Sequence, residues 1–336
     1  MRKIVECVPN FSEGRDKNII EAIADEIRRT KGAKLLNVEP DADYNRVVVT
    51  FAGEPDGVVE AAFAATKKAY ELIDMRKHKG EHPRMGAADV VPFVPVSGVT
   101  MEECIELSKR YAKKVADELN VPIYLYENSA TKPERKNLSN IRAGEYEGLP
   151  EKLKDPEWKP DFGPAKFVPR YGATATGARF FLIAYNVNLN TEDKNIANEI
   201  ARRIRESGRK LKREDGTKER VPGRFKATKA MGVYLENYNI TQVSINLVNY
   251  RITAPHEIFE GIKHDAAEFG VEVTGSEIVG LVPLEAMLMA GKYQISKKKG
   301  IIPLDERKIV DIAIEYLGLS DLYKFKPEKK IIEYMV

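Results

Sequence analysis

The alternating stretch Ile240-Thr-Gln-Val-Ser-Ile-Asn-Leu-Val-Asn-Tyr250 decides the fold of the second half of this chain. Apolar and polar side chains alternate along it, with Val243, Ile245 and Leu247 on one face and Gln242, Ser244 and Asn246 on the other. This period of two predicts a strand that is covered on one side. We expect helices on the apolar face. The amide face is expected to meet either water or the hydrogen-bonding groups of a polar ligand.

The elements around this strand follow the order β-α-β-β-α-β. A strand at 179–189 precedes a helix capped by Thr191, and a strand at 230–236 is joined to the quoted strand by the short polar turn 237–239. A further helix starts at Pro255, stops at Gly270 and leads into a strand at 271–282. This order is the split arrangement of a ferredoxin-like unit. The charged segment 205–226 is predicted to be a solvated insertion.

The first half repeats this order more loosely. The predicted strands are 4–11, 33–38, 46–52 and 90–96, the predicted helices are 17–30 and 55–72, and a helix at 100–119 with a strand at 121–126 extends the unit. A chain of 336 residues exceeds the usual size of a single core, so we expect two domains, 1–178 and 179–336. The predicted fold class is α+β: two ferredoxin-like subdomains with helices on one face of each sheet and a ligand groove between the sheets.

Composition excludes several classes of protein. The chain has 54 basic and 51 acidic residues, a net charge of +3, which is not that of a dedicated nucleic-acid binder. Its two cysteines, Cys7 and Cys104, form no disulfide framework and indicate a reducing compartment. No apolar run is long enough to span a membrane, and the N-terminus lacks a signal-peptide core. We therefore expect a soluble, cytoplasmic protein without nucleic-acid or membrane partners.

The stretch Gly80-Glu-His-Pro-Arg-Met-Gly86 contains one of only four histidines. A residue before proline avoids the helical region, so His82 is expected in an extended loop. Imidazole titrates near neutral pH and suits general acid-base catalysis, although a structural histidine is the alternative. His78, in a basic run, is predicted to lie on a solvated surface. His256 and His264 show no zinc-like spacing, so no metal is expected.

The proline-rich segment 128–171 shows little regular pattern but contains several aromatic residues. We interpret it as an ordered loop packed over a cleft. The following Gly172-Ala-Thr-Ala-Thr-Gly-Ala-Arg179 lacks the lysine and hydroxyl residue of a phosphate loop, so no nucleotide site is predicted there.

Several strings in the chain resemble the glutamate formimidoyltransferase family, the N-terminal part of formiminotransferase-cyclodeaminases. They are Val5-Glu-Cys-Val-Pro-Asn-Phe-Ser-Glu-Gly14, His78-Lys-Gly-Glu-His-Pro-Arg-Met-Gly-Ala87, Asp161-Phe-Gly-Pro164 with Gly172-Ala-Thr174, and Ile331-Ile-Glu-Tyr334. The resemblance implies transfer of a formimino group from N-formimino-L-glutamate to N5 of tetrahydrofolate, releasing L-glutamate, in histidine catabolism. It also implies a homodimer with the folate in the groove between subdomains, and a separate cyclodeaminase for the 5-formimino product.

The resemblance also implies which residues act. The family's catalytic histidine falls on His82, the expected general acid and base, with an activity optimum near neutral pH. The family's folate-binding segment falls on Gly163, Pro164, Ala165, Lys166, Phe167, Val168, Pro169, Arg170, Tyr171 and Gly172. Within this segment we expect aromatic rings to pack against the folate and basic side chains to meet its glutamate tail. Glu39, Glu81 and Asp89 are candidates for electrostatic support of the cationic adduct, and each is otherwise an ordinary loop or cap residue.

Two alternative functions remain open. The same residues would serve formyl transfer between 5-formyltetrahydrofolate and glutamate, because the sequence does not distinguish the donors. The second alternative is a non-catalytic folate- or RNA-binding module, although RNA binding on an open sheet requires exposed aromatic residues, whereas the predicted open face carries amides and a hydroxyl.

Overall fold

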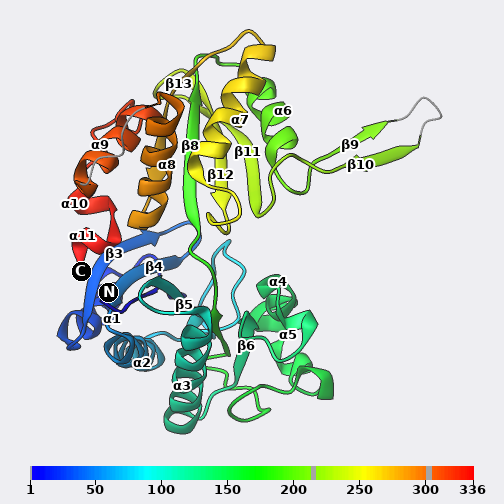
Figure 1. Ribbon diagram of the computed structural model, residues 1–336. Coiled ribbons are helices and arrows are strands. Elements are labelled where there is room, and N and C mark those ends of the chain that lie inside the picture. The colour runs from blue at the N-terminus through cyan, green and yellow to red at the C-terminus, as the bar shows by residue number, and fades with distance from the viewer. Residues whose placement is uncertain (1, 213–216, 300–304) are drawn as a thin grey trace. The chain divides into compact units, whose positions relative to one another are not determined.

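The computed structural model describes residues 2–212, 217–299 and 305–336 (Figure 1). Residue contacts divide the chain into two compact units, one of residues 1–180 together with Val336 and one of residues 181–335. Each unit combines a mainly antiparallel sheet with helices, as the α+β prediction requires. The division falls two residues after the predicted domain boundary.

The second unit is built on a four-stranded antiparallel sheet. Its strands are β8 (Ile183–Leu189), β11 (Thr228–Leu235), β12 (Ile240–Leu247) and β13 (Val273–Val279), in the spatial order β11-β12-β8-β13. Val243, Ile245 and Leu247 of β12 are each at most 1% exposed. They are buried because α6 (Lys194–Ile204) packs on β11 and β12, and α7 (Pro255–Glu268) packs on β8 and β13. The predicted apolar face is thus the helix-covered face.

The predicted cap of α6 is wrong by two residues. Asp193 is the N-cap, and its carboxylate accepts a hydrogen bond from the Asn195 amide, whereas the Thr191 hydroxyl accepts from Asp193 in the turn before the helix. Asp and Thr are both good caps, so their order in the sequence does not distinguish them. The α7 helix begins at Pro255 as predicted, where the missing N–H of proline costs no hydrogen bond.

Several elements of the second unit were not predicted. The charged insertion contains the hairpin β9 (Arg209–Lys212) and β10 (Lys218–Val221), which extends away from α6 in Figure 1. Beyond β13 the chain forms helices α8 (Leu284–Lys297), α9 (Glu306–Leu317), α10 (Pro327–Lys330) and α11 (Ile332–Met335). Ile309, Val310, Ala313 and Leu317 of α9 are buried at helical spacing, a pattern that was present in the sequence.

The first unit has a larger, mixed sheet. Its strands are β1 (Ile4–Cys7), β2 (Asn10–Phe11), β3 (Ala33–Asp41), β4 (Arg46–Gly53), β5 (Ala88–Ser97), β6 (Ile123–Glu127) and β7 (Thr174–Ala178). From β3 at one edge the order runs through β4, then β1 and β2, then β5 and β7, to β6 at the other edge. The predicted strand 4–11 is split at Pro9, which has no N–H for the ladder.

Strand β7 was not predicted because its sequence, Thr-Ala-Thr-Gly-Ala, has no alternation. All five residues are buried, and the strand pairs in parallel with both β5 and β6. Burial on both faces removes the period-two signal. The hydroxyl groups of Thr174 and Thr176 are satisfied by donating to the Ala88 and Val91 carbonyls at 2.6 and 2.7 Å.

Helices cover both faces of part of this sheet, so the prediction of helices on one face is wrong for the first unit. The main core lies between one face and α1 (Lys17–Arg29), α2 (Pro55–Leu72) and α3 (Met101–Leu119). A second cluster lies on the opposite face, where Val90 and Tyr124 pack with Ile141 and Leu149. These two come from α4 (Leu138–Arg142) and α5 (Glu145–Lys152), short helices inside the proline-rich segment.

The proline-rich segment is held by a buried ion pair. Arg135, in the short 3-10 helix Pro133–Arg135, is 2% exposed and donates to the Asp161 carboxylate at 2.7 Å. It also donates to the backbone carbonyls of Glu157 and Lys159, next to the 3-10 helix Pro156–Trp158. The segment was expected to be an ordered loop. Its structure is a set of short helices organised around this guanidinium.

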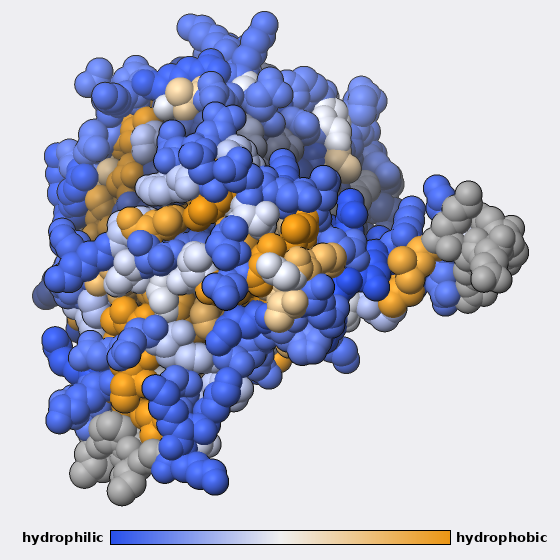
Figure 2. Space-filling view, turned by 90° about the horizontal axis from the view of Figure 1, so that it is seen from above, coloured by the Kyte–Doolittle hydropathy of each residue, from blue (hydrophilic) through white to orange (hydrophobic). Residues whose placement is uncertain are grey.

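The surface agrees with the mixed composition. Figure 2 shows hydrophilic residues over most of the face that it presents, with hydrophobic residues in separate groups between them. Among the described residues, no helix has the length and apolar character needed to cross a membrane.

Candidate active site in the first unit

The predicted acid-base loop lies between α2 and β5, and it is anchored to the turn that joins β3 to β4. A Cβ atom on Gly80 would lie 2.3 Å from the Tyr44 carbonyl oxygen, so only glycine allows this approach. The Asn45 side chain donates to the Lys79 carbonyl at 3.0 Å, and the Glu81 amide donates to the Asp43 carbonyl at 3.3 Å. The loop is therefore held at its N-terminal half by backbone contact.

The second half of the loop is anchored to the end of the predicted folate segment. The Ala87 amide donates to the Tyr171 carbonyl at 2.8 Å, and the Ala173 amide donates to the Met85 carbonyl at 3.0 Å. A Cβ atom on Gly86 would lie 2.1 Å from the Ala173 carbonyl oxygen, and one on Gly172, whose φ is +83°, would lie 2.1 Å from that of Met85. The structure thus brings the two predicted motifs into direct backbone contact.

His82 is half-buried between the exposed residues Glu81 and Pro83, and it lies outside any helix. Its ring centroid is 6.3 Å from that of Tyr44, and the Arg46 guanidinium lies 5.8 Å from the same tyrosine ring. Burial holds the pKa of His82 well below its usual value, at about 4, and the positive charges of Arg142 and Arg46 act in the same direction. The imidazole is therefore neutral at pH 7.

Asp89 does not face the solvent as a free carboxylate. It lies on β5, is 1% exposed, accepts a hydrogen bond from the Met85 amide at 2.9 Å and forms an ion pair with Arg142 of α4. Burial raises the pKa of Asp89, while Arg142 and the Met85 amide oppose this shift. Its role as support for a reacting cation stays a prediction, and in this structure the carboxylate is paired with the Arg142 guanidinium.

The two other candidate acids are exposed. Glu39 lies on β3 and accepts a hydrogen bond from the Asn37 side chain at 2.6 Å. Glu81 lies in the loop next to His82.

The ten residues of the predicted folate segment differ in how far their side chains are exposed to solvent. Lys166 and Arg170 are exposed, and Arg170 donates to the Glu71 carbonyl at 2.6 Å. Phe167 packs on Tyr146 of α5, with ring centroids 5.3 Å apart. Tyr171 is fully buried, packs on Tyr70 and shares a hydrogen bond with the Thr174 hydroxyl at 2.5 Å. Packing of a ligand ring against Tyr171 stays a prediction, and in this structure the tyrosine ring is covered by protein.

Sequence reasoning missed the arginines around His82. Arg46, Arg84 and Arg142 lie on a strand, in the loop and on a short helix, so only the tertiary fold brings their charges together. Arg46 donates from one terminal nitrogen to the Asn10 side chain at 2.9 Å. Arg84 is 5% exposed and pairs with Glu145 and Glu147 of α5 at 2.9 and 2.6 Å. In the sequence Arg84 belongs to the quoted stretch 80–86, whereas Arg46 and Arg142 lie in no motif.

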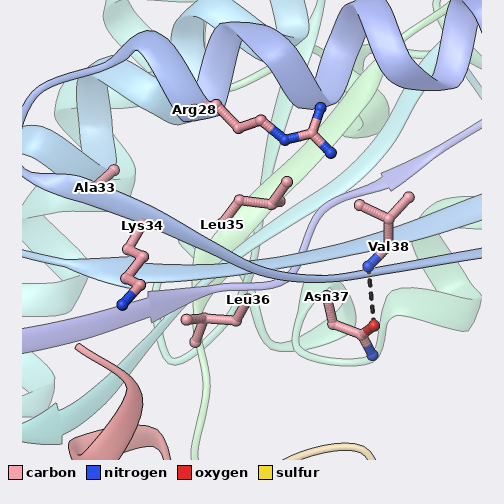
Figure 3. Close-up of a pocket in the computed structure, with 7 residues that line it drawn as sticks. All are labelled: Arg28, Ala33, Lys34, Leu35, Leu36, Asn37 and Val38. Atoms are coloured by element: carbon pink, nitrogen blue, oxygen red, sulfur yellow. Dashed lines mark hydrogen bonds between the residues drawn. The ribbon is translucent and has the colours of Figure 1, made fainter. Parts of the chain in front are cut away.

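A cavity on the edge of the same sheet is separate from this loop. It measures about 510 Å³ and is lined by Arg28 and residues 33–38 (Figure 3). Figure 3 shows Leu35 on the Arg28 side of β3, with Lys34 and Leu36 on the other side. Its lining has no histidine or carboxylate, so it does not offer acid-base chemistry.

The second unit carries a polar network on the sheet face opposite its helices. The Gln242 amide donates to the Asn188 side chain at 2.8 Å and to Glu277 of β13 at 2.9 Å. Asn186 and Tyr323 also donate to Glu277, at 2.9 and 2.7 Å. The predicted amide row is therefore centred on a carboxylate. Its negative charge opposes a nucleic-acid backbone, which disfavours the RNA-binding alternative.

The four histidines provide one cluster with metal-ligand types among the described residues. His264, Asp265 and Glu268 have ligand atoms within 4.8 Å of one another. Both carboxylates are already paired, Asp265 with Arg224 and Glu268 with Arg203, each at 2.6 Å. Two guanidinium groups beside the cluster disfavour a bound cation.

The fold and the loop together define a two-unit α+β protein with a neutral histidine among arginines. Family models match both units: the formiminotransferase domain, N-terminal subdomain, over residues 4–179, and the formiminotransferase domain over residues 184–336. The chain therefore belongs to the formiminotransferase family.

Named relatives agree with this assignment. The chain is 46% identical to a glutamate formimidoyltransferase of Streptococcus pyogenes serotype M1, over 88% of this chain and 94% of the relative. A glutamate formimidoyltransferase of Thermoplasma acidophilum is 45% identical over 87% of this chain and 92% of its own length. The formimidoyltransferase-cyclodeaminase of Dictyostelium discoideum is 57% identical over the whole chain, which spans 61% of that longer relative.

We predict that Asp89→Asn destabilises the protein, because it leaves the Arg142 guanidinium facing an amide in place of a carboxylate. Breaking a mostly buried ion pair costs about 3 kcal/mol or more. Glu151→Gln is the matched control, since its pair with Lys154 is exposed on both sides and contributes within about 0.5 kcal/mol. Urea unfolding followed by circular dichroism measures both. Equal effects of the two substitutions would contradict a structural role for the Asp89–Arg142 pair.

Proposed function

We propose that this chain transfers a formimino group from N-formimino-L-glutamate to N5 of tetrahydrofolate, forming 5-formiminotetrahydrofolate and L-glutamate. The supporting observation is the loop of residues 78–86. It holds a neutral, half-buried histidine near arginines, and its backbone is hydrogen-bonded to the end of the predicted folate segment. Family membership and the names of the bacterial and archaeal relatives, which this chain covers almost completely, support the same reaction.

His82 is the proposed general acid and base. N5 of the folate attacks the formimino carbon, and the tetrahedral adduct must lose a proton from N5 and supply one to the departing glutamate nitrogen. A neutral imidazole accepts the first proton. The resulting imidazolium lies near Arg142 and Arg46, whose charges favour its deprotonation and hence the return of the proton to the leaving nitrogen.

The arginines are suited to an anionic substrate. Both formiminoglutamate and the folate tail carry carboxylates, and arginine is the usual side chain for binding them. Arg46 and Arg142 each use one terminal nitrogen for a protein acceptor, Asn10 and Asp89 respectively. Their remaining terminal nitrogens are proposed to meet donor carboxylates. Since Asp89 is already paired, Glu39 and Glu81 remain the proposed supports for the cationic adduct.

The finer features of the resemblance complete the proposal. We propose that the folate lies along residues 163–172, where Lys166 and Arg170 are exposed and Phe167 is half-buried. The ferredoxin-like classification of each unit is supported by the β-α-β-β-α-β order of the second unit and its repetition in the first. A homodimer and a cytoplasmic location belong to the same proposal.

The reaction is tested by a donor screen with the purified chain. Formiminoglutamate with tetrahydrofolate is expected to give 5-formiminotetrahydrofolate and free glutamate. Formylglutamate and the reverse reaction from 5-formyltetrahydrofolate with glutamate are expected to be much slower. Folate products are separated by chromatography and glutamate is measured enzymatically. Faster turnover of either formyl compound would replace formimino transfer by the formyl-transfer alternative.

We predict that His82→Gln lowers turnover by roughly two to four orders of magnitude, the range for loss of a general acid-base group. Binding of tetrahydrofolate should stay within a few fold of the native affinity, because the folate segment is intact. Steady-state kinetics and fluorescence titration of Trp158 measure these two quantities. His256→Gln, a histidine in the second unit, is the control. Native turnover in His82→Gln would remove the proposed role.

We predict that kcat/KM stays level from pH 8 to below pH 6. The sequence alone led us to expect an optimum near neutral pH, so the predicted active range is wider on the acid side. This profile reports the free enzyme, in which the pKa of His82 is about 4, so the base form is lost only when the pH falls toward that value. Arg46→Gln removes a nearby positive charge and should move the acid limb upward, toward pH 6.5. A limb at pH 6.5 in the native chain would contradict the depressed pKa.

A further inference from the structure

His78 lies between two groups that determine which of its ring nitrogens carries the proton. Its Nε2 atom is 2.8 Å from the Asn45 carbonyl oxygen, and its Nδ1 atom is 3.2 Å from Nε of Arg84. A carbonyl oxygen only accepts and a guanidinium only donates. The ring must therefore donate from Nε2 and accept at Nδ1, which is the neutral tautomer with its proton on Nε2.

Arg84 continues this chain of contacts to helix α5. Its terminal nitrogens pair with Glu145 and Glu147, and its own backbone carbonyl accepts a hydrogen bond from the Tyr146 amide at 2.9 Å. The side chain is almost fully buried. A continuous path thus runs from the β3–β4 turn through His78 and Arg84 to α5.

His82 lies in the chain segment between the two bonded side chains, four residues after His78 and two before Arg84. Among the described residues we find no hydrogen bond from a protein group to its ring, so the ring is positioned by its backbone and by its contact with Tyr44. That backbone is flanked by the contacts of His78 on one side and of Arg84 on the other. Any change in these contacts moves the imidazole relative to a bound substrate.

We propose that neutral His78, acting through Arg84, is a positioning residue for His82. This inference rests on the acid-base role of His82 given above. The basic run 76–79 is thus more than a solvated surface, because its histidine is half-buried and bonded at both ring nitrogens.

Protonation of His78 would break the path. It would place a second donor at Nδ1 opposite Arg84 Nε and bring two positive charges together. Burial and Arg84 lower the pKa of His78, and the more distant Arg15 acts in the same direction, while Glu13 and the bond to Asn45 act against it. Glu147 and His82 are the other charged or titratable groups nearby. The link is therefore expected to persist below pH 6.5.

The tautomer is tested directly by NMR of the full chain labelled with ¹⁵N-histidine. The native protein should show a histidine signal with the Nε2-protonated pattern that is retained below pH 6.5, and the signal that disappears in His78→Gln should be of this kind. Arg84→Gln should remove the donor to Nδ1 and raise the pKa of that histidine. A tautomeric mixture for His78, or an unchanged pKa in Arg84→Gln, would overturn the proposal. This measurement does not depend on activity, so it stands or falls separately from the proposed reaction.

Kinetics test the positioning role. The side chain of His78→Gln keeps an amide donor and a carbonyl acceptor, but it loses the rigid ring that holds these two groups toward the Asn45 carbonyl and Arg84 Nε. We expect kcat to fall by roughly 10- to 100-fold, as for a misplaced catalytic group, with KM values within about threefold. His264→Gln, an exposed histidine of the second unit, is the control and should be unchanged. Native kcat in a folded His78→Gln protein would overturn the proposal, and if that variant fails to fold, the tautomer of the native protein decides.

Discussion

The close approach of three backbone segments is the constraint on which the candidate site depends. The loop 78–86 touches the β3–β4 turn through Gly80 and the end of the proposed folate segment through Gly86 and Gly172. A side chain at any of these positions would overlap a carbonyl oxygen, so the contacts exist only because the residues are glycines. Segments far apart in the sequence are thereby fixed around one histidine. Backbone contacts therefore determine the position of the loop, and the charged side chains project from this backbone.

The charged side chains near His82 determine which ligands these backbone segments can bind. Of the arginines near His82, Arg142 is paired with Asp89 and Arg84 with two glutamates of α5, whereas Arg46 is hydrogen-bonded to the neutral Asn10 side chain. Burial and the charges of Arg142 and Arg46 lower the pKa of His82 and so keep the imidazole neutral, and the charge of Arg46 attracts anions. The proposed donor and acceptor both carry carboxylates, which would balance the charge of Arg46. In that proposal the arginine charge would serve both binding and proton transfer, since a bound carboxylate would also stabilise the imidazolium when it forms.

Much of the fold was predictable because its elements carry regular patterns. The strand 240–247 alternates, α2 begins at Pro55, and both are found where expected. Strand β7 was missed because a strand buried on both faces between parallel neighbours does not alternate. Helices α4 and α5 were missed because they are too short for a periodic pattern, although they cover the second face of the sheet and supply Arg142. Sequence periodicity predicts elements that have one exposed face, whereas β7 and its neighbouring strands are covered on both faces of the sheet.

In the candidate site, too, only features that are encoded locally in the sequence could be predicted. His82 was predictable because its neighbours, Pro83 and the glycines, restrict the backbone locally. The arginines near it were not, since Arg46 and Arg142 are brought close to His82 only by the tertiary fold. His78 is the clearest case: in the sequence it belongs to a run of charges, which predicts a solvated surface, yet one carbonyl and one guanidinium determine its tautomer. Composition describes the average environment of a segment, whereas the protonation of a single ring is set by the two atoms that meet it.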